Sequence, residues 1–462
     1  MENFWDFSVW GWFNLLAVLL MSLLAANALK KAFRFLEASL IPTSVLGGGI
    51  LLLISGLYKL ITGDVFFDTA FFGGNGMANL EVMTYHTLAL GFTASALKGS
   101  GSKLTKKRQV EIFNTGVTTV STYLMQAAVG MGITMVAAAV MKEFFSAAGV
   151  LLAFGYGQGT GQALNYGGIY ENEYGFVGGK SFGLTIAALG FLCASIGGVI
   201  HLNILKRRKK IVIGSGENLQ DDFEEIQGKD EIPMHGSMDK FTVQFALIAT
   251  AYFLSYLLMG ALGFALPGMR SVIYGFNFLL GVLAGTLVKT VLNFLRKKNV
   301  VKKQYINDFL MTRTSNFFFD VMVVAGIAAI RLGILEKYWG VILILGVAGL
   351  VITYFYNRLV ACTLFKEYQE EQFLMMYGML TGTASTGVIL LREIDGKFKT
   401  PASDNLIYQN FPAIVFGFPM MLLATLAPKK PVLTLCILVV FFLAMNVLLF
   451  RSVIFKRRKV KK

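Results

Sequence analysis

The sequence predicts an all-α polytopic membrane protein. Of its 462 residues, 55% are hydrophobic and 15% are charged, whereas about 25% are charged in soluble proteins. The mean hydropathy is +0.62, and many apolar runs approach the ~20 residues that a helix needs to cross a bilayer. Two glycine-rich polar segments, FGYGQGTGQALNYGG (154–168) and YGMLTGTASTGVILL (377–391), lie where a membrane helix should continue. We therefore expect about 11 transmembrane helices and two re-entrant loops.

The apolar segments define the expected spans in order. In the first half they lie at 8–29, 38–62, 80–97, 112–141 and 181–205, and in the second half at 241–265, 271–295, 304–332, 340–361, 402–428 and 431–455. The glycine-rich segments, 147–168 and 373–394, each precede the fifth span of their half. Unpaired backbone groups cost several kcal/mol in hydrocarbon and are tolerated only inside protein or beside water. This cost is why we interpret both segments as re-entrant loops.

A polar stretch at 206–240 divides the chain. It separates an N-terminal repeat, 1–205, from a C-terminal repeat, 241–430, and we interpret it as a cytoplasmic linker. Residues 431–462 form an extra final helix and a basic cytoplasmic tail. Because each repeat has five spans, an odd number, the second repeat is expected to be inverted. Interrupted helices in corresponding positions of two inverted repeats are typical of secondary transporters, whose substrate site lies near the bilayer midplane.

Loop charges predict the orientation. Most of the 42 basic residues fall in loops that become cytoplasmic if the N-terminus is outside, as the positive-inside rule requires. All four tryptophans (Trp5, Trp10, Trp12 and Trp339) then lie at the outer interface, where aromatic rings are favoured. The N-terminal MENFWDF lacks the basic region of a cleaved signal peptide, so the first apolar segment is expected to be retained as a span.

Composition and spacing argue against several other functions. The net charge of +15 is concentrated in loops beside spans, so we expect no nucleic-acid partner. Cys193, Cys362 and Cys436 lie within expected spans without metal-type spacing, so we expect no cofactor or redox role. The sequence has no His/Glu metal pair, acid dyad or activated serine arrangement, so we do not expect an enzyme.

The tips of the two loops carry the candidate substrate site, which comprises Gln158, Gly159, Thr160, Gly161, Gln162, Gly382, Thr383, Ser385 and Thr386. Glycines allow close backbone approach to a ligand, and hydroxyls and amides offer neutral ligands without a buried charge. Hydroxyl oxygens suit a hard cation, which makes Thr160, Thr383 and Ser385 candidate Na⁺ ligands. The alternative is a helix-packing seam of small residues. The recurrence of two such segments in corresponding places favours the site.

Three further polar residues are weaker candidates. Asp320 is an acid inside an apolar helix and therefore a functional candidate, or else it lies at a helix end or pairs with Arg313. His86 can relay protons, although a hydrogen-bonded structural histidine is the more common case. Arg392 can meet a substrate carboxylate, but its distance from the second tip favours an interface residue paired with Glu393 or Asp395.

At these residues the chain resembles the bacterial sodium:glutamate symporter family. The match is densest in Gly157-Gln158-Gly159-Thr160-Gly161, where the family has Gly-His-Gly-Thr-Gly, and in Glu173-Tyr174-Gly175-Phe176. Ile41-Pro42, with Val45 and Gly47-Gly48, is similar to its second-span motif. The resemblance implies a homodimeric, sodium-coupled L-glutamate symporter of the bacterial cytoplasmic (inner) membrane, with a transport domain that moves against a scaffold.

The sequence also departs from the family pattern. Gln158 replaces the histidine, Gln162 and Leu164 replace an alanine and a tryptophan, and the second tip reads GTAST where the family has Gly-Ala-Thr-Pro-Thr. Leu390 or Leu391 stands near the place of an expected asparagine. We therefore expect a symporter of glutamate or a related small carboxylate. A symporter of another organic solute, proton-coupled or sodium-coupled, and a channel remain alternatives.

Overall fold

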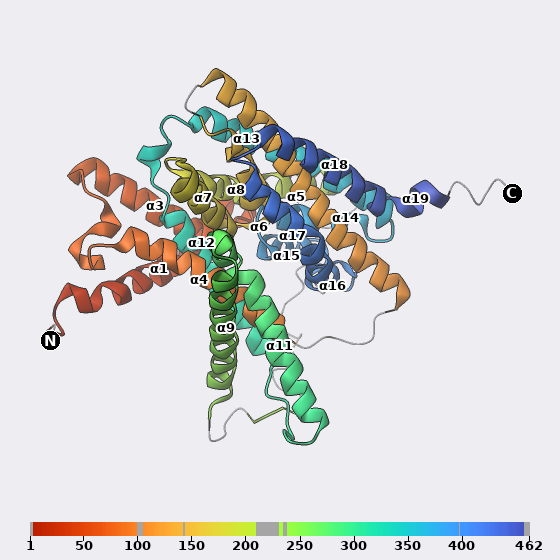
Figure 1. Cartoon of the computed structure of the whole chain (residues 1–462), viewed down its shortest axis with the longest axis horizontal. Helices are drawn as coiled ribbons and strands as arrows, with labels where there is room; N and C mark the ends of the chain where they lie inside the picture. Colours follow the sequence, from red (N-terminus) through yellow and green to blue (C-terminus); the bar gives the residue numbers. More distant parts are fainter. Residues whose placement is uncertain are drawn as a thin grey trace. The chain divides into compact units, whose positions relative to one another are not determined.

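The computed structural model of the chain describes residues 3–98, 105–141, 144–208, 231–233, 238–396 and 398–456 (Figure 1). These residues are mostly helical, and among them the only β-type pairing is an isolated bridge between Glu231 and Gln304. The predicted all-α class is confirmed.

The helices are labelled in chain order. The α-helices are α1 (Phe7–Ala32), α2 (Arg34–Ala38), α3 (Thr43–Thr62), α4 (Gly76–Leu97), α5 (Lys106–Val140), α6 (Leu151–Gln158), α7 (Thr160–Tyr174), α8 (Gly179–Arg207), α9 (Lys240–Ala265), α10 (Arg270–Gly275), α11 (Asn277–Lys297), α12 (Asp308–Ala328), α13 (Trp339–Leu364), α14 (Gln369–Thr381), α15 (Ala384–Arg392), α16 (Ala402–Tyr408), α17 (Asn410–Leu426), α18 (Pro431–Leu449) and α19 (Arg451–Lys456). Short 3₁₀ helices lie at Phe66–Asp68, Ala70–Phe72, Ser146–Val150, Pro267–Met269 and Leu332–Leu335.

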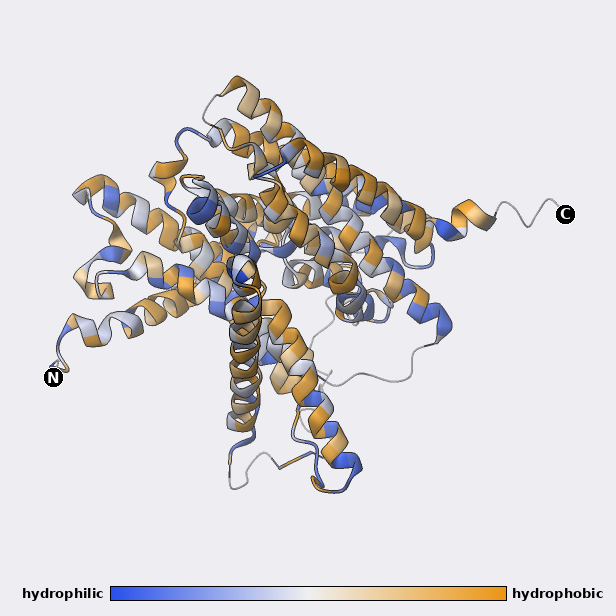
Figure 2. Ribbon diagram, in the orientation of Figure 1, coloured by the Kyte–Doolittle hydropathy of each residue, from blue (hydrophilic) through white to orange (hydrophobic). Residues whose placement is uncertain are grey.

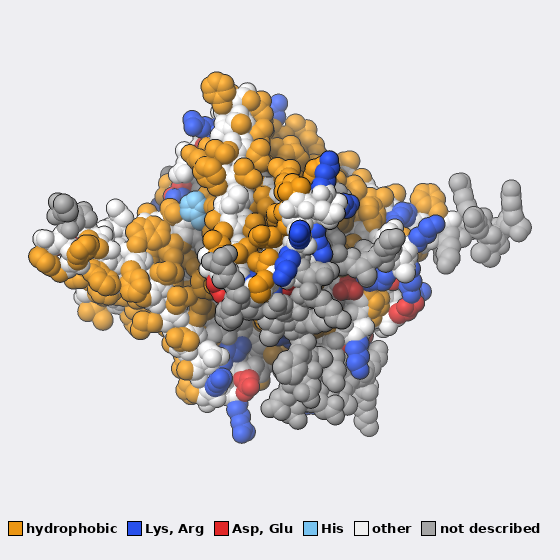
Figure 3. Space-filling model, turned by 90° about the horizontal axis from the view of Figure 1, so that it is seen from below, with side chains coloured by type: hydrophobic (Ala, Val, Ile, Leu, Met, Phe, Trp, Pro, Cys, Tyr) orange, Lys and Arg blue, Asp and Glu red, His pale blue; other side chains and the backbone are white. Residues whose placement is uncertain are grey.

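Eight helices of the described residues are long and apolar enough to cross a membrane: α1, α3, α5, α8, α9, α11, α13 and α18. The pair α16–α17, bent by 52°, is a ninth if it is counted as one span. Figure 2 shows the apolar character along these helices, and hydrophobic side chains cover wide areas of the face in Figure 3. The chain is therefore a polytopic membrane protein. The expected spans 80–97 and 304–332 are the helices α4 and α12, which are not among the eight.

Several expected spans are shorter or interrupted. The span expected at 38–62 begins at Thr43, because Pro42 disfavours a helical conformation in the residue before it. The span expected from 304 begins at Asp308, where Asn307 Oδ1 accepts from the Leu310 N–H at 2.7 Å. The span expected at 271–295 is divided at Phe276 and the final span at Phe450. Most of the expected linker (209–230 and 234–237) and the tail 457–462 lie outside the described residues.

The chain forms two compact units. The larger unit comprises Met1–Met77, Leu104–Glu217 and Gly326–Lys462, and the smaller unit comprises Ala78–Lys103 and Asn218–Ala325. Each unit draws segments from both halves of the sequence. In the larger unit, α5 packs against α6, α13, α17 and α18, and α8 packs against α6, α7, α13 and α14. In the smaller unit, α9 and α11 run side by side (Figure 1).

Candidate functional site

The first glycine-rich segment forms a helical hairpin in the larger unit. Its helices α6 and α7 meet at Gly159, which has φ 79° and ψ −168°, a region that is essentially restricted to glycine. The rings of Phe154 and Tyr166 are stacked with centroids 3.9 Å apart. Because these rings come from α6 and α7 respectively, α7 folds back along α6. The hairpin turns at the predicted tip.

The second segment forms a similar hairpin from α14 and α15, which meet at Gly382 and Thr383. A Cβ atom added to Gly378 would lie 2.8 Å from the Gly387 Cα, so the two helices pack closely through these glycines. This contact is a helix-packing seam of small residues. Gly382 instead lies at the break, where an added Cβ would lie 2.9 Å from Thr386 Oγ1.

Gln126 of α5 contacts the region of both breaks. Its Nε2 donates to the Leu380 carbonyl at 2.8 Å and to Thr353 Oγ1 at 2.9 Å. On the side of the first hairpin, a Cβ added to Gly157 would lie 3.3 Å from Gln126 Oε1. That oxygen is buried and has no hydrogen-bond partner. One buried side chain therefore bonds to the second hairpin and lies beside the first.

Gly190 of α8 provides a second shared contact. A Cβ added to Gly190 would lie 2.5 Å from the Thr381 carbonyl oxygen and 3.1 Å from Tyr156 Cδ2. Thr381 is the last residue of α14, and Tyr156 lies in α6, three residues before the first break. The two breaks are therefore neighbours within the larger unit.

The first tip buries neutral polar groups. Thr160, Gly161 and Gln162, the first residues of α7, are buried, whereas Gln158 is half-buried. The amide nitrogen and oxygen of Gln162 are both buried without a hydrogen-bond partner. Such an unpaired polar group costs about 1–3 kcal/mol, and few such groups persist in native structures without a reason. Thr160 Oγ1 lies 3.0 Å from the position of a Cβ added to Gly326.

The second tip carries three hydroxyls at its break. Thr386 is fully buried, and Thr383 and Ser385 are half-buried. Thr383 Oγ1 and Thr386 Oγ1 are 3.4 Å apart. Two helices end and two begin at the breaks, so carbonyl groups and N–H groups both point toward this region. Such a mixture can accept a hard cation through oxygens and an anion through N–H groups.

A line of buried neutral side chains continues from this region along α5. Thr119 Oγ1 donates to Gln409 Oε1 at 2.9 Å, and Gln372 Nε2 donates to Thr115 Oγ1 at 3.1 Å. Asn405 Nδ2 in turn donates to Gln372 Oε1 at 3.0 Å. The interior of the larger unit is therefore polar over more than two turns of a membrane helix.

None of the three weaker candidates belongs to the residues at the breaks. His86 and Asp320 belong to the smaller unit, where His86 Nδ1 is 2.7 Å from the Tyr252 hydroxyl. Asp320 is half-buried in α12. Arg392 is exposed at the end of α15, and its guanidinium lies 5.3 Å from the centre of the Phe398 ring. Asp395, one of its expected partners, accepts from the Lys399 backbone N–H at 2.8 Å.

An ion-pair cluster that the sequence did not indicate fixes the base of the second hairpin. Arg358 of α13 donates to both Glu370 oxygens, at 2.5 and 2.9 Å. His201 of α8 lies 3.0 Å from Glu370 through Nε2 and 2.8 Å from the Tyr354 hydroxyl through Nδ1. A carboxylate only accepts, so Nε2 carries the proton. Burial acts to raise the pKa of Glu370, but the bonds from His201 and Arg358 outweigh it and lower the pKa to about 2.

Glu370→Gln is expected to lower the Tm and to remove part of its pH dependence. Because the folded pKa is depressed from 4.5 to about 2, the stabilisation is fully present above about pH 4.5 and is lost as the pH falls toward 2. Thermal unfolding of the detergent-solubilised protein between pH 7 and pH 3 measures both effects. Glu367→Gln is the matched control, because its partner Lys107 and Glu367 itself are exposed and such pairs contribute about 0–1 kcal/mol. Equal Tm losses in both variants would contradict this role.

Gln126 and Thr353 are the site residues that sequence reasoning missed. Both lie inside long apolar helices, where a single amide or hydroxyl is a weak signal. A polar residue within a membrane span is a functional candidate, and Gln126 follows a run of threonines in TGVTTVSTYLMQ. That spacing could have placed Gln126 on one polar face with Thr115, Thr119 and Thr122.

The chain matches no known family model, no curated protein and no solved structure. The functional assignment therefore depends on the site itself.

Proposed function

We propose that the protein is a secondary active transporter, a sodium-coupled symporter of glutamate or a related small carboxylate. The observation that carries this proposal is the meeting of two broken helical hairpins at the same buried residues, Gln126 and Gly190. Paired broken helices around one site are typical of transporters that alternate access. In this proposal the hairpins are re-entrant loops among about 11 spans, and the two halves of the sequence are inverted repeats.

The proposed site uses neutral groups for both ligands. Na⁺ binds through oxygens of Thr160, Thr383 and Ser385 together with carbonyls freed at the breaks. The substrate carboxylate binds at the N-terminal ends of α7 and α15, where N–H groups and the helix dipole favour an anion. Gln162, whose buried amide has no partner in the structure, is placed to bind the substrate.

The proposal includes the bacterial inner membrane, an outside N-terminus, a cytoplasmic C-terminus and a homodimer, which follow from the loop charges and the family resemblance. Proton coupling or another organic solute is compatible with the same neutral site. A channel is a weaker alternative, because selectivity filters are built from rings of equivalent groups. The two breaks here differ in sequence, GQGTG against TGTAS, which favours a carrier.

Uptake by proteoliposomes tests the function. Labelled glutamate, aspartate, citrate and a neutral amino acid are supplied with an imposed Na⁺ gradient, an imposed H⁺ gradient or none. We expect saturable uptake of a carboxylate that is driven by the Na⁺ gradient. Uptake of the same solute that is indifferent to Na⁺ would contradict the coupling, and an unsaturable ohmic current would favour the channel.

A further inference from the structure

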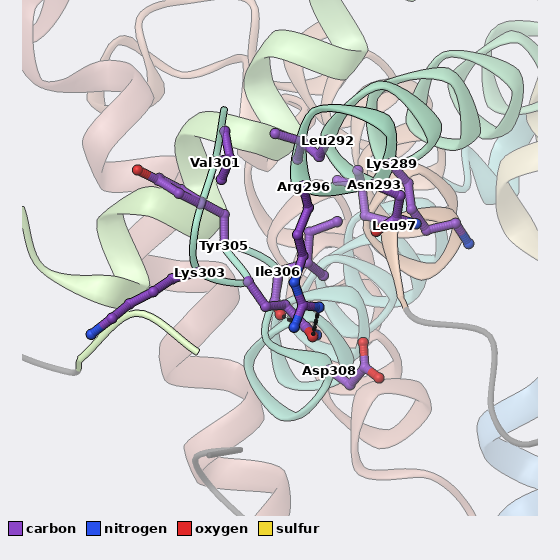
Figure 4. A pocket seen from close by; sticks show the side chains of 11 residues that line it. Leu97, Lys289, Leu292, Asn293, Arg296, Val301, Lys303, Tyr305, Ile306 and Asp308 are labelled. Carbon is purple, nitrogen blue, oxygen red and sulfur yellow. Dashed lines mark hydrogen bonds between the residues drawn. The ribbon is translucent and has the colours of Figure 1, made fainter. Parts of the chain in front are cut away.

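The smaller unit contains a basic pocket of about 330 Å³ (Figure 4). It lies at the ends of α4 and α11 and beside the segment that leads into α12. Lys289, Arg296 and Lys303 line it together with one acid, Asp308, so these four side chains carry a formal charge of 3 − 1 = +2. The volume lies at the lower end of the roughly 300–1,000 Å³ range of ligand pockets. The pocket is therefore suited to a small anionic group.

The pocket lies on one face of α11, and exposed apolar side chains lie on the opposite face. Lys289 and Arg296 are seven residues apart on α11, which places them on the same side of the helix. Leu283, Leu287 and Val291 are exposed and lie on the other side by the same periodicity. Since α11 is a candidate membrane span that ends at Lys297, the pocket lies near the boundary between hydrocarbon and water.

Internal hydrogen bonds position the basic groups. Lys289 Nζ donates to the Lys98 carbonyl at 2.8 Å, beyond the end of α4. Arg296 Nη1 donates to Gln304 Oε1 at 3.2 Å, and Gln304 Nε2 donates to the Ile306 carbonyl at 3.0 Å. Figure 4 shows Arg296 extending from α11 toward the segment 303–308. Two of the three cations are therefore held in place before a ligand binds, which lowers the entropic cost of binding.

We propose that this pocket binds a phosphate group, supplied by the headgroup of an anionic phospholipid or by a soluble phosphate. Arg and Lys form charge-assisted hydrogen bonds with phosphate oxygens, and the guanidinium can do so through two parallel bonds. Basic pockets between membrane helices at the cytoplasmic side bind anionic headgroups, and the basic run Arg296-Lys297-Lys298 marks this end as cytoplasmic by the positive-inside rule. The adjoining lipid-facing side of α11 favours the phospholipid source.

Thermal unfolding of the purified full-length protein in neutral detergent tests the proposal with three added probes: phosphatidylglycerol, phosphatidylcholine and inorganic phosphate. We expect phosphatidylglycerol to raise the Tm of the wild type and phosphatidylcholine to leave it unchanged. Arg296→Gln should raise the half-saturating phosphatidylglycerol concentration roughly tenfold, because a hydrogen bond between charged groups is lost. Lys297→Gln is the matched control and should leave the half-saturating concentration unchanged. Lys297 is the next residue of α11, is exposed and does not line the pocket.

Asp308→Asn supplies a test in the opposite direction. Removing the one acid that lines the pocket raises the formal charge of the four side chains from +2 to +3. Phosphatidylglycerol should therefore bind more tightly. A general loss of folding cannot produce tighter binding. A Tm rise with inorganic phosphate in addition to phosphatidylglycerol would support the phosphate chemistry, and a rise with inorganic phosphate but not with phosphatidylglycerol would assign a soluble source. Equal behaviour of Arg296→Gln and Lys297→Gln, or no response of the wild type to phosphatidylglycerol or to inorganic phosphate, would overturn the proposal.

Discussion

Replacing Gly159 with alanine is expected to abolish uptake while the protein still inserts and folds. Gly159 has φ 79° and ψ −168° at the break between α6 and α7, and non-glycine residues there cost about 1–3 kcal/mol. The first hairpin must therefore turn differently in the variant, which displaces the N-terminal end of α7 and with it Thr160 and Gln162. Uptake per folded protein in proteoliposomes measures the effect.

Gly132→Ala is the control for this experiment. Gly132 lies within α5 in the same unit, and a Cβ added there meets no atom within 4 Å. Alanine also favours the helix interior by roughly 0.5–1 kcal/mol over glycine, so transport should be unchanged. Normal uptake in Gly159→Ala would show that the break is not part of the site and would leave the packing seam as the better interpretation.

The sequence predicted the two helix breaks but not the residues that contact both of them. Glycine and hydroxyl residues between apolar segments are a local signal, and both hairpins turn within the segments that carried it, at Gly159 and at Gly382. The contacts of Gln126 and Gly190 with both hairpins are long-range, and no local pattern reports them. Gly378 and Gly387 had the same appearance in sequence as Gly382, but they pack two helices together.

Only some of the helix boundaries were predicted. Gly63, with φ 81°, ends α3 at Thr62 as predicted. Pro42 is also a local signal, but the expected span was carried past it to residue 38, so the N-terminal end at Thr43 was predicted wrongly. The divisions at Phe276 and Phe450 were not predicted, because apolar residues lie on both sides of each, although Arg451 follows Phe450 directly. The Arg358–Glu370 pair was missed for another reason, since its two residues lie in different segments and come together only through packing of α13 against α14.

Replacing Gln126 with leucine is expected to lower uptake at least tenfold, because Gln126 of α5 hydrogen-bonds to the second hairpin and packs beside the first. The change keeps the approximate size of the side chain and removes both donor bonds, to the Leu380 carbonyl and to Thr353 Oγ1. Each buried partner left unsatisfied costs about 1–3 kcal/mol. Gln109→Ala, at an exposed position of the same helix, is the control and should transport normally.

A double-mutant cycle with Thr353→Val separates the two bonds. If the Leu380 carbonyl at the second hairpin is the contact that matters, Thr353→Val alone has a small effect and the double variant resembles Gln126→Leu. If the bond to Thr353 matters instead, each single change lowers uptake to a similar extent and the double variant loses little more, because residues in direct contact commonly show coupling of 0.5–3 kcal/mol. Uptake rate and the half-saturating substrate concentration are measured per folded protein in all four proteins. Gln126→Leu with wild-type uptake, or a loss matched by an equal loss of folded protein, would remove Gln126 from the site.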